Sequence, residues 1–463
     1  MFHDLPRVRL GLSFAAVLGV LFMAGCGSSK SSSTTSAAAP AASSTSATSA
    51  TSTAAATSSS TDTSSCGPKP GTAATGTPIK LGAINTKQPG TDFTDIENME
   101  GAYFACVNAN GGVNGHPIQL IKLTEPTQPA QIAADATQLV QTDKVVGESG
   151  NSSILECTIN HAYWEKHNFF VIAAGIAPEC YSTPNIADVN MGPRYSSDGA
   201  VQYVLTLHPS KIVFDQSNVP GTGYIAAGPA ALAKNANVPI TQLTENVPIN
   251  DANSVALKEV DDAGPNGAVV LNFTPPEALV ILQAAQKLGL ENRVKAWACS
   301  TPCNTDFLAQ SLGPKWDGKF FVNAELADPD DTNTPTMNLY KAILKQYGTD
   351  VSGGIGSFSE MGFTMGEIAT HALESIKGAY TTQSVNAAFQ GVKDYDTGML
   401  CQLWTFGNYP SHIPNNQDYT VTPSNGKMVL KQGCTNISSV DPQIAQYRSA
   451  AGTAATAPGQ PAG

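Results

Sequence analysis

Charged residues are scarce in this chain, and basic ones are scarcer than acidic ones. Only 13% of the 463 residues are charged, and 25 Lys and Arg stand against 37 Asp and Glu, giving a formal net charge of −12. The body of the chain contains no basic run. Because an acidic surface repels phosphate groups, this composition excludes nucleic acids and anionic headgroups as main partners. With 41% hydrophobic residues, the chain can still bury a large core.

Motifs of common enzyme classes are also missing. The chain has no Gly-x-Ser-x-Gly, no His-Glu-x-x-His and no Gly-x-x-x-x-Gly-Lys, which excludes the usual signatures of esterases, zinc peptidases and phosphate-binding loops. His161 and His167 are six residues apart, not four, and are typical of surface histidines. We therefore predict a binding protein that has no catalytic residue, metal or cofactor; an exported hydrolase is the weaker alternative.

Long hydrophobic runs are limited to the N-terminus. Arg7 and Arg9 precede an apolar stretch, Leu10 to Ala24, which is too short and wrongly flanked for a stable membrane span. It ends in Met-Ala-Gly-Cys26 and resembles a bacterial lipobox, so residues 1–26 are predicted to be a lipoprotein signal with Cys26 as the lipidated residue. Ordinary secretory cleavage near Ala24 is the alternative. Either reading places the rest of the chain outside the cytoplasm.

Two segments lack the residues needed for a core. Residues 27–77 begin with a long run of Ser, Thr and Ala and are predicted to be a disordered tether. Residues 446–463 are rich in Ala, Gly and Pro and are predicted to be a disordered tail.

The chain has nine cysteines, so lipidation of Cys26 would leave an even number in an oxidising compartment. Proximity favours disulfides, although the sequence alone cannot determine connectivity. A zinc site is the alternative, but paired Cys-x2-Cys clusters are absent. The favoured pairs are Cys299 with Cys303, Cys157 with Cys180, Cys401 with Cys434, and Cys66 with Cys106.

The body alternates strand and helix signals. An apolar strand at 79–84 precedes a helix at 97–110, whose Met99, Tyr103 and Cys106 share one face. A strand at 117–123, a helix at 130–141 and a strand starting at 145 follow. The pattern restarts with strands at 211–214 and 268–271 and helices at 223–236 and 276–288. The β-α-β order predicts an α/β fold of two doubly wound parallel-sheet lobes.

Five stretches in order resemble the type I periplasmic binding proteins that bind branched-chain amino acids for ABC importers. They are residues 101–118, which contain Asn110-Gly-Gly-Val-Asn-Gly115, and residues 135–146, 171–179, 320–326 and 340–363. The resemblance implies two lobes joined by a three-crossing hinge. It places lobe 1 at 78–196 and 324–398 and lobe 2 at 197–323 and 399–445, with crossings near 194–198, 322–327 and 397–401.

The resemblance also implies a ligand site in the cleft where the strand ends of both lobes meet. The loop 150–153 matches the family loop whose serine holds a ligand carboxylate. Ile176 stands where amino-acid binders carry threonine, and no Glu stands in the segment 299–306, where the family places the partner of the ammonium group. The predicted ligand contacts are Gln88, Asn151, Ser152, Ser153, Gly175, Ile176, Tyr224 and Thr274.

The expected function is capture of a small polar solute, such as a branched-chain amino acid or a related amide or carboxylate. The expected partners are an ABC permease and, through the lipid, the cell membrane. A surface receptor that feeds a sensor rather than a transporter is the alternative.

Overall fold

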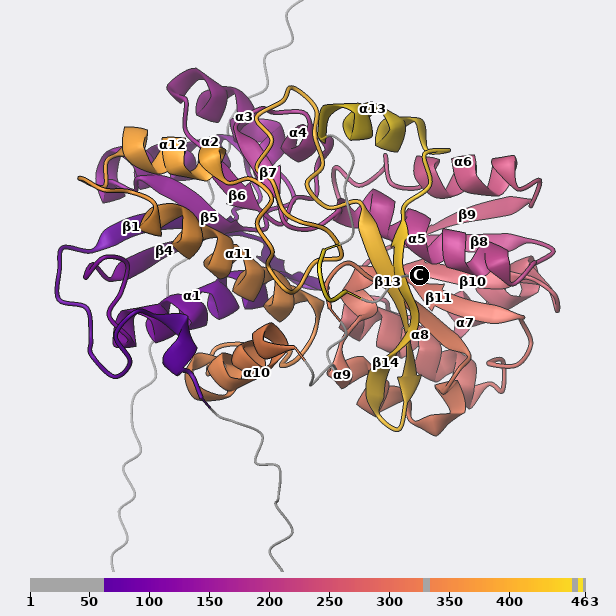
Figure 1. The fold of residues 1–463 in the computed structure, drawn as a ribbon. Coiled ribbons are helices and arrows are strands. Elements are labelled where there is room, and N and C mark those ends of the chain that lie inside the picture. Colours follow the sequence, from indigo (N-terminus) through magenta and orange to yellow (C-terminus); the bar gives the residue numbers. More distant parts are fainter. Residues whose placement is uncertain (1–61, 328–333, 452–456, 461–463) are drawn as a thin grey trace, which may run out of the picture. The chain divides into compact units, whose positions relative to one another are not determined.

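The computed structural model describes residues 62–327, 334–451 and 457–460. Its body contains two main sheets, and we name the parts built on them lobe 1 and lobe 2 (Figure 1). The sheet of lobe 1 has the strand order β4-β1-β5-β6-β7 and is parallel throughout. Its strands are β1 (Ile79–Asn85), β4 (Ile118–Thr124), β5 (Gly147–Asn151), β6 (Val171–Ala173) and β7 (Ile186–Asp188).

The sheet of lobe 2 has the strand order β14-β13-β12-β11-β10-β8-β9. Its strands are β8 (Ile212–Ser217), β9 (Ile240–Glu245), β10 (Ala268–Asn272), β11 (Ala296–Cys299), β12 (Phe320–Ala324), β13 (Gln417–Ser424) and β14 (Lys427–Asn436). The first five are parallel and repeat the winding order of lobe 1, whereas β13 and β14 add an antiparallel edge. The two-stranded hairpin of β2 (Lys87–Gln88) and β3 (Thr91–Asp92) follows β1. The doubly wound α/β prediction is thus confirmed, with an edge that the sequence pattern did not reveal.

Helices cover both faces of each sheet, and each face has its own hydrophobic core. Lobe 1 carries α1 (Thr94–Ala109), α10 (Pro335–Tyr347), α11 (Ser357–Glu374) and α12 (Thr382–Gly391) on one face, and α2 (Pro129–Thr137), α3 (Glu156–His167), α4 (Pro178–Tyr181) and α13 (Pro442–Ala451) on the other. Lobe 2 carries α7 (Ala252–Ala263), α8 (Pro275–Lys287) and α9 (Asp306–Leu312) on one face, and α5 (Gly192–Thr206) and α6 (Ala227–Asn235) on the other. Short turns lie at 64–66, 138–143, 301–303 and 314–316.

The strands are buried on both faces because their apolar side chains alternate between two cores. In β1, Leu81 packs with α1 and α11, whereas Ile84 packs on the opposite face with Trp164 of α3. Two-sided burial explains why the strands read as continuous apolar runs. The predicted helix at 97–110 is α1, and the glycine turn that ends it is present. At Gly112 the φ angle is +61°, and a Cβ atom there would lie 2.3 Å from the His116 carbonyl oxygen, so only glycine fits this turn.

The second crossing between the lobes lies within the predicted range, 322–327, whereas the first and third lie elsewhere than predicted. The first lies at 189–191, between β7 of lobe 1 and α5 of lobe 2, and the second begins at residue 325, after β12. The third lies just before β13, because Met399, Leu400 and Trp404 belong to one core cluster of lobe 1 and Ile413 belongs to the other. The predicted boundary at 398 is therefore too early.

After β14 the chain returns to lobe 1. Ile444 and Tyr447 of α13 are buried there, and the Tyr447 ring lies 6.2 Å from that of Tyr181 and 6.1 Å from that of Tyr195. The end of the chain is thus not all tail, because α13 extends to Ala451 and Ala457 donates its N–H to the Cys401 carbonyl.

The predicted tether also ends earlier than residue 77. Cys66 is bonded to Cys106 of α1, and the Lys69 and Ala74 N–H groups donate to the carbonyls of Asn110 and Asn108. Residues 66–76 are therefore part of lobe 1. The rest of the predicted tether, residues 27–61, and Cys26 lie outside the described residues.

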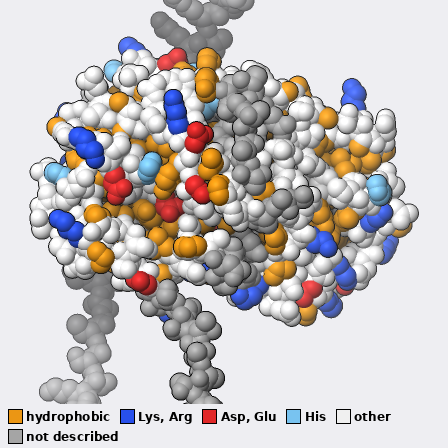
Figure 2. Space-filling view, in the orientation of Figure 1, with side chains coloured by type: hydrophobic (Ala, Val, Ile, Leu, Met, Phe, Trp, Pro, Cys, Tyr) orange, Lys and Arg blue, Asp and Glu red, His pale blue; other side chains and the backbone are white. Residues whose placement is uncertain are grey.

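All four favoured disulfides are present, namely Cys66–Cys106, Cys157–Cys180, Cys299–Cys303 and Cys401–Cys434. Lys and Arg side chains are spread over the face shown in Figure 2 among many uncharged ones, as the low charge content predicts. In the part of the chain that the structure describes, no helix combines the length and the apolar composition needed to cross a bilayer.

Candidate ligand-binding site

A cavity of about 90 Å³ lies between the two lobes, at the carboxyl ends of their strands. In doubly wound sheets this edge is where ligands bind, because loops and helix N-termini converge there. Most of its wall is apolar. The lining residues are Thr91, Phe93, Ile96, Ser152, Ile154, Ala174, Ile176, Asn190, Pro193, Ser196, Ser217, Val219, Thr222, Ile225, Asn272, Phe273, Thr274, Pro302, Glu325, Phe358 and Met361.

Three of the predicted ligand contacts line this cavity. Ser152 and Ile176 come from loops of lobe 1, and Thr274 comes from the loop before α8 of lobe 2. Gln88 lies instead on a neighbouring cavity of about 480 Å³, which shares Thr91, Thr274 and Phe358 with the first.

Four other predicted contacts do not line the central cavity. The Asn151 amide bonds to Glu148 and Glu156, and Ser153 bonds to Glu125 and the Glu156 N–H. The Gly175 carbonyl accepts from Tyr181. The Tyr224 hydroxyl donates to the Ile176 carbonyl, so Tyr224 connects the lobes. Ser153 acts as a helix cap, the alternative role for a hydroxyl at this position.

Sequence reasoning missed the polar residues at the hinge end of the cavity. Asn190 follows β7 and Glu325 follows β12. Each lies within two residues of the end of a strand that leads into a crossing. A polar residue at that position of the sequence could have been predicted to face the cavity. Most of the apolar lining residues were also not predicted, because the sequence does not distinguish a Phe that lines a cavity from a Phe that packs in the core.

Glu325 is the one ionisable side chain in the cavity wall formed by the described residues. It is only 2% exposed, and its Oε2 accepts the Met191 N–H at 2.9 Å. Burial, which penalises the charged form, raises the pKa of Glu325 to about 8, while the bond from Met191 opposes this shift. At neutral pH this carboxyl can therefore hold or release a proton in response to what lies next to it.

The two lobes touch around the cavity. The Thr274 hydroxyl donates to the Gly90 carbonyl at 3.1 Å. On the same side, the Ser357 N–H donates to the Asn304 carbonyl at 2.9 Å. Both lobes thus contribute to the cavity wall and are in direct contact beside it.

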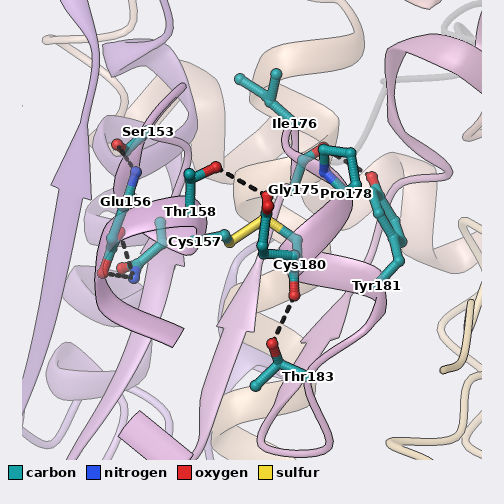
Figure 3. Close-up of a disulfide and its surroundings, with 12 residues drawn as sticks. Ser153, Glu156, Cys157, Thr158, Gly175, Ile176, Pro178, Cys180, Tyr181 and Thr183 are labelled. Carbon is teal, nitrogen blue, oxygen red and sulfur yellow. Dashed lines mark hydrogen bonds between the residues drawn. A yellow bond between two sulfur atoms is a disulfide. The ribbon is translucent and has the colours of Figure 1, made fainter. Parts of the chain in front are cut away.

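Disulfides hold cavity loops in both lobes. In lobe 1, Cys157–Cys180 joins the start of α3 to α4, between the turn that carries Ser153 and the turn that carries Gly175 and Ile176 (Figure 3). In lobe 2, Cys299–Cys303 closes the turn that carries Pro302. A flexible loop loses conformational entropy when it binds a ligand, which weakens the affinity. Disulfides that hold the loops in place before binding reduce this entropy loss.

Comparison with known proteins gives one family. The profile described as "Periplasmic binding protein" matches residues 78–427. A search of curated protein sequences found no match.

Solved structures of similar fold include three with different ligands in their descriptions. A fatty acid ABC transporter substrate-binding protein from Thermomonospora curvata has a TM-score of 0.65 at 18% identity, covering 81% of this chain and 97% of its own. A branched chain amino acid ABC transporter from Thermus thermophilus with bound valine has a TM-score of 0.69 at 15% identity, and the match covers 79% of this chain and 98% of that one. A solute binding protein of an ABC transporter from R. palustris in complex with benzoate has a TM-score of 0.61 at 14% identity, and the match covers 77% of this chain and 96% of that one. At these identities the likeness shows the fold, and ligand identity differs among the three. Together with the profile match over most of the chain, the two-lobed architecture shows that this chain belongs to the periplasmic binding protein family, with the type I fold.

Proposed function

We propose that this protein captures a small, largely apolar solute outside the cytoplasm and delivers it to the permease of an ABC importer. The observation that carries the proposal is the apolar cavity between two lobes that are joined by chain crossings. Because crossings can absorb backbone rotation, the lobes can open to admit a solute and close over it. The structurally similar proteins described as ABC transporter components support the delivery step.

A thermal-shift screen over amino acids, amides, amines and small carboxylates tests solute capture, because a solute that binds only the folded protein raises its melting temperature. Isothermal titration then gives the affinity of each hit. Absence of any saturable hit would contradict solute capture.

The variant Ala174→Phe should weaken binding of any hit by about tenfold or more, since a large side chain would occupy the cavity. Ala174 is buried in the cavity wall. The matched control Ala133→Phe lies at an exposed position of α2 and should leave affinity unchanged. Equal affinity in both variants would place the solute elsewhere.

Anchoring through Cys26 belongs to the same proposal and rests on the lipobox resemblance. The variant Cys26→Ser should move the protein from the membrane fraction of cells to the soluble extracytoplasmic fraction, because the lipid attachment point is lost. Immunoblotting of the two fractions measures this. Continued membrane association of the variant would reject the lipid anchor without affecting the proposal of solute capture.

A further inference from the structure

The hinge end of the cavity presents two buried hydrogen-bond acceptors. Asn190 Oδ1 has no donor, whereas the Glu325 carboxyl accepts from the Met191 N–H and from the side chains of Thr301 and Ser196. Asn190 is only 6% exposed, and its Nδ2 donates to the Gly175 carbonyl at 3.1 Å. That carbonyl can only accept, so the amide orientation is determined and Oδ1 is the atom left without a partner. Glu325 lies beside it, since it accepts the N–H of the next residue, Met191. Asp188, two residues before Asn190, is fully buried, and burial raises its pKa well above the usual value.

No basic side chain balances these acceptors. Among the residues that the structure describes, no Lys, Arg or His lines the cavity. Arg194 follows the lining residue Pro193, but its guanidinium binds both oxygens of Asp441 at 2.7 Å and also donates to the Tyr224 carbonyl. Burial keeps the Glu325 carboxyl largely protonated while no cation is near. A ligand that brings positive charge and N–H donors would let it ionise, so this end of the cavity favours such a ligand.

The lobe-1 loop that would hold a ligand carboxylate is already occupied by protein side chains. At the start of α3, three successive N–H groups are taken: that of Ile154 by Thr86 Oγ1, that of Leu155 by Glu125, and that of Glu156 by Ser153 Oγ. The Ser153 hydroxyl also binds Glu125. The carboxylate of Glu125 thus takes the place that a ligand anion would need at this helix N-terminus.

Lobe 2 offers no replacement for these donors. The helix that starts at the cavity, α8, begins with Pro275 and Pro276, which have no N–H. In the turn after β11, the Thr301 N–H donates to Ser196, and the next residue, Pro302, again has no N–H. The remaining polar groups of the wall include hydroxyls and amides, which hold a carboxylate less well than charged donors do.

We propose that the solute is a primary amine with an apolar body, bound as its ammonium ion between Glu325 and Asn190. Carboxylates, amino acids among them, bind poorly. This assignment rests on the proposed function and names the chemistry of its ligand. The apolar walls, with Phe93, Phe273 and Phe358, enclose the body. The three N–H donors of the ammonium group meet the acceptors at the hinge, whereas a carboxylate there would face Glu325 and find no cation.

Two matched probe sets test the assignment by calorimetry on the full-length protein at pH 7. One set is benzylamine, benzamide and benzoate, and the other is isoamylamine, isovalerate and leucine. Each amine should bind at least about tenfold more tightly than the carboxylate or amino acid of its set, because an unpaired charge at the hinge costs more than 1.4 kcal/mol. This comparison needs no mutation and so does not depend on the folding of a variant.

The variant Glu325→Gln should then weaken amine binding by about tenfold or more, because it removes the negative charge. The control Glu165→Gln, at an exposed position of α3, should leave amine binding unchanged. Tighter binding of benzoate, isovalerate or leucine, or equal binding of benzamide and benzylamine, would overturn the assignment and leave solute capture standing. If no solute of any class binds, solute capture falls and this assignment with it.

Discussion

Replacing Arg194 with methionine should lower the free energy of unfolding by about 3–5 kcal/mol, which is the usual cost of breaking a buried ion pair by removing one partner. Arg194 donates through Nε and Nη2 to the two oxygens of Asp441, each at 2.7 Å. Asp441 and the neighbouring Asp198 are both fully buried, so the variant would leave two acids without their cation. The effect is measurable by urea unfolding followed by circular dichroism.

The position of this pair gives it a structural role. Arg194 lies in the first turn of α5 in lobe 2, whereas Asp441 precedes α13, which packs on lobe 1. Loss of the pair should therefore also release α13, and hydrogen exchange should increase in residues 442–447. The control Lys258→Met breaks an exposed pair, Lys258–Asp262 at 3.4 Å, and should cost no more than about 0.5 kcal/mol. Similar losses in both variants would contradict the importance of the buried pair.

The protein should be more stable at pH 5 than at pH 8. Burial raises the pKa of Glu100 and of Glu325 to about 8 and that of Asp418 to about 7. In the unfolded chain these carboxyls ionise near pH 4 to 4.5. Between the two pKa values the folded protein holds a proton that the unfolded chain has released, so rising pH favours unfolding.

The pH window follows from these values. Below about pH 4, these carboxyls are protonated in both the folded and the unfolded protein, and the stability that the raised pKa values provide is fully present. It is lost progressively as the pH rises, by about 1.4 kcal/mol per pH unit for each such carboxyl, until the folded pKa is passed near pH 7 to 8. Melting temperatures by calorimetry across pH 5 to 8 measure the trend.

Glu100 offers the clearest single test. It is fully buried and accepts a hydrogen bond from the Ser149 hydroxyl. The variant Glu100→Gln removes the titrating group but preserves the shape, and it should reduce the slope of stability against pH. The exposed control Glu165→Gln should keep the wild-type slope. A wild-type stability that rises from pH 5 to pH 8 would refute the prediction.

Much of the fold was predictable, because a strand that is buried on both faces of its sheet appears in the sequence as a short continuous apolar run. The runs 79–84, 211–214 and 268–271 became β1, β8 and β10, and the glycine turn after α1 has the required positive φ. The disulfide pairs were predictable from proximity along the chain. The antiparallel edge of lobe 2 was not, since β13 and β14 are separated from β12 by the whole second segment of lobe 1. Pairing over such distances leaves no periodic signal.

The candidate site was only partly predictable. Of the residues predicted in the loops after the strands, Ser152, Ile176 and Thr274 line the cavity. Which residue of a loop faces inward depends on hydrogen bonds to distant partners. Ser153 turns away because Glu125, 28 positions earlier, binds its hydroxyl, and no local pattern contains that contact.

Local properties of the chain, namely strand and helix periodicity, cysteine spacing and family motifs, were enough to predict the two lobes and the kind of protein and to favour one set of disulfide pairs. Only the tertiary structure decided where the crossings lie, which side chains form the cavity wall and which donors remain free. These depend on residues far apart in sequence that meet at one sheet edge, such as Asn190 with Glu325, and on whether each buried polar atom has already found a partner.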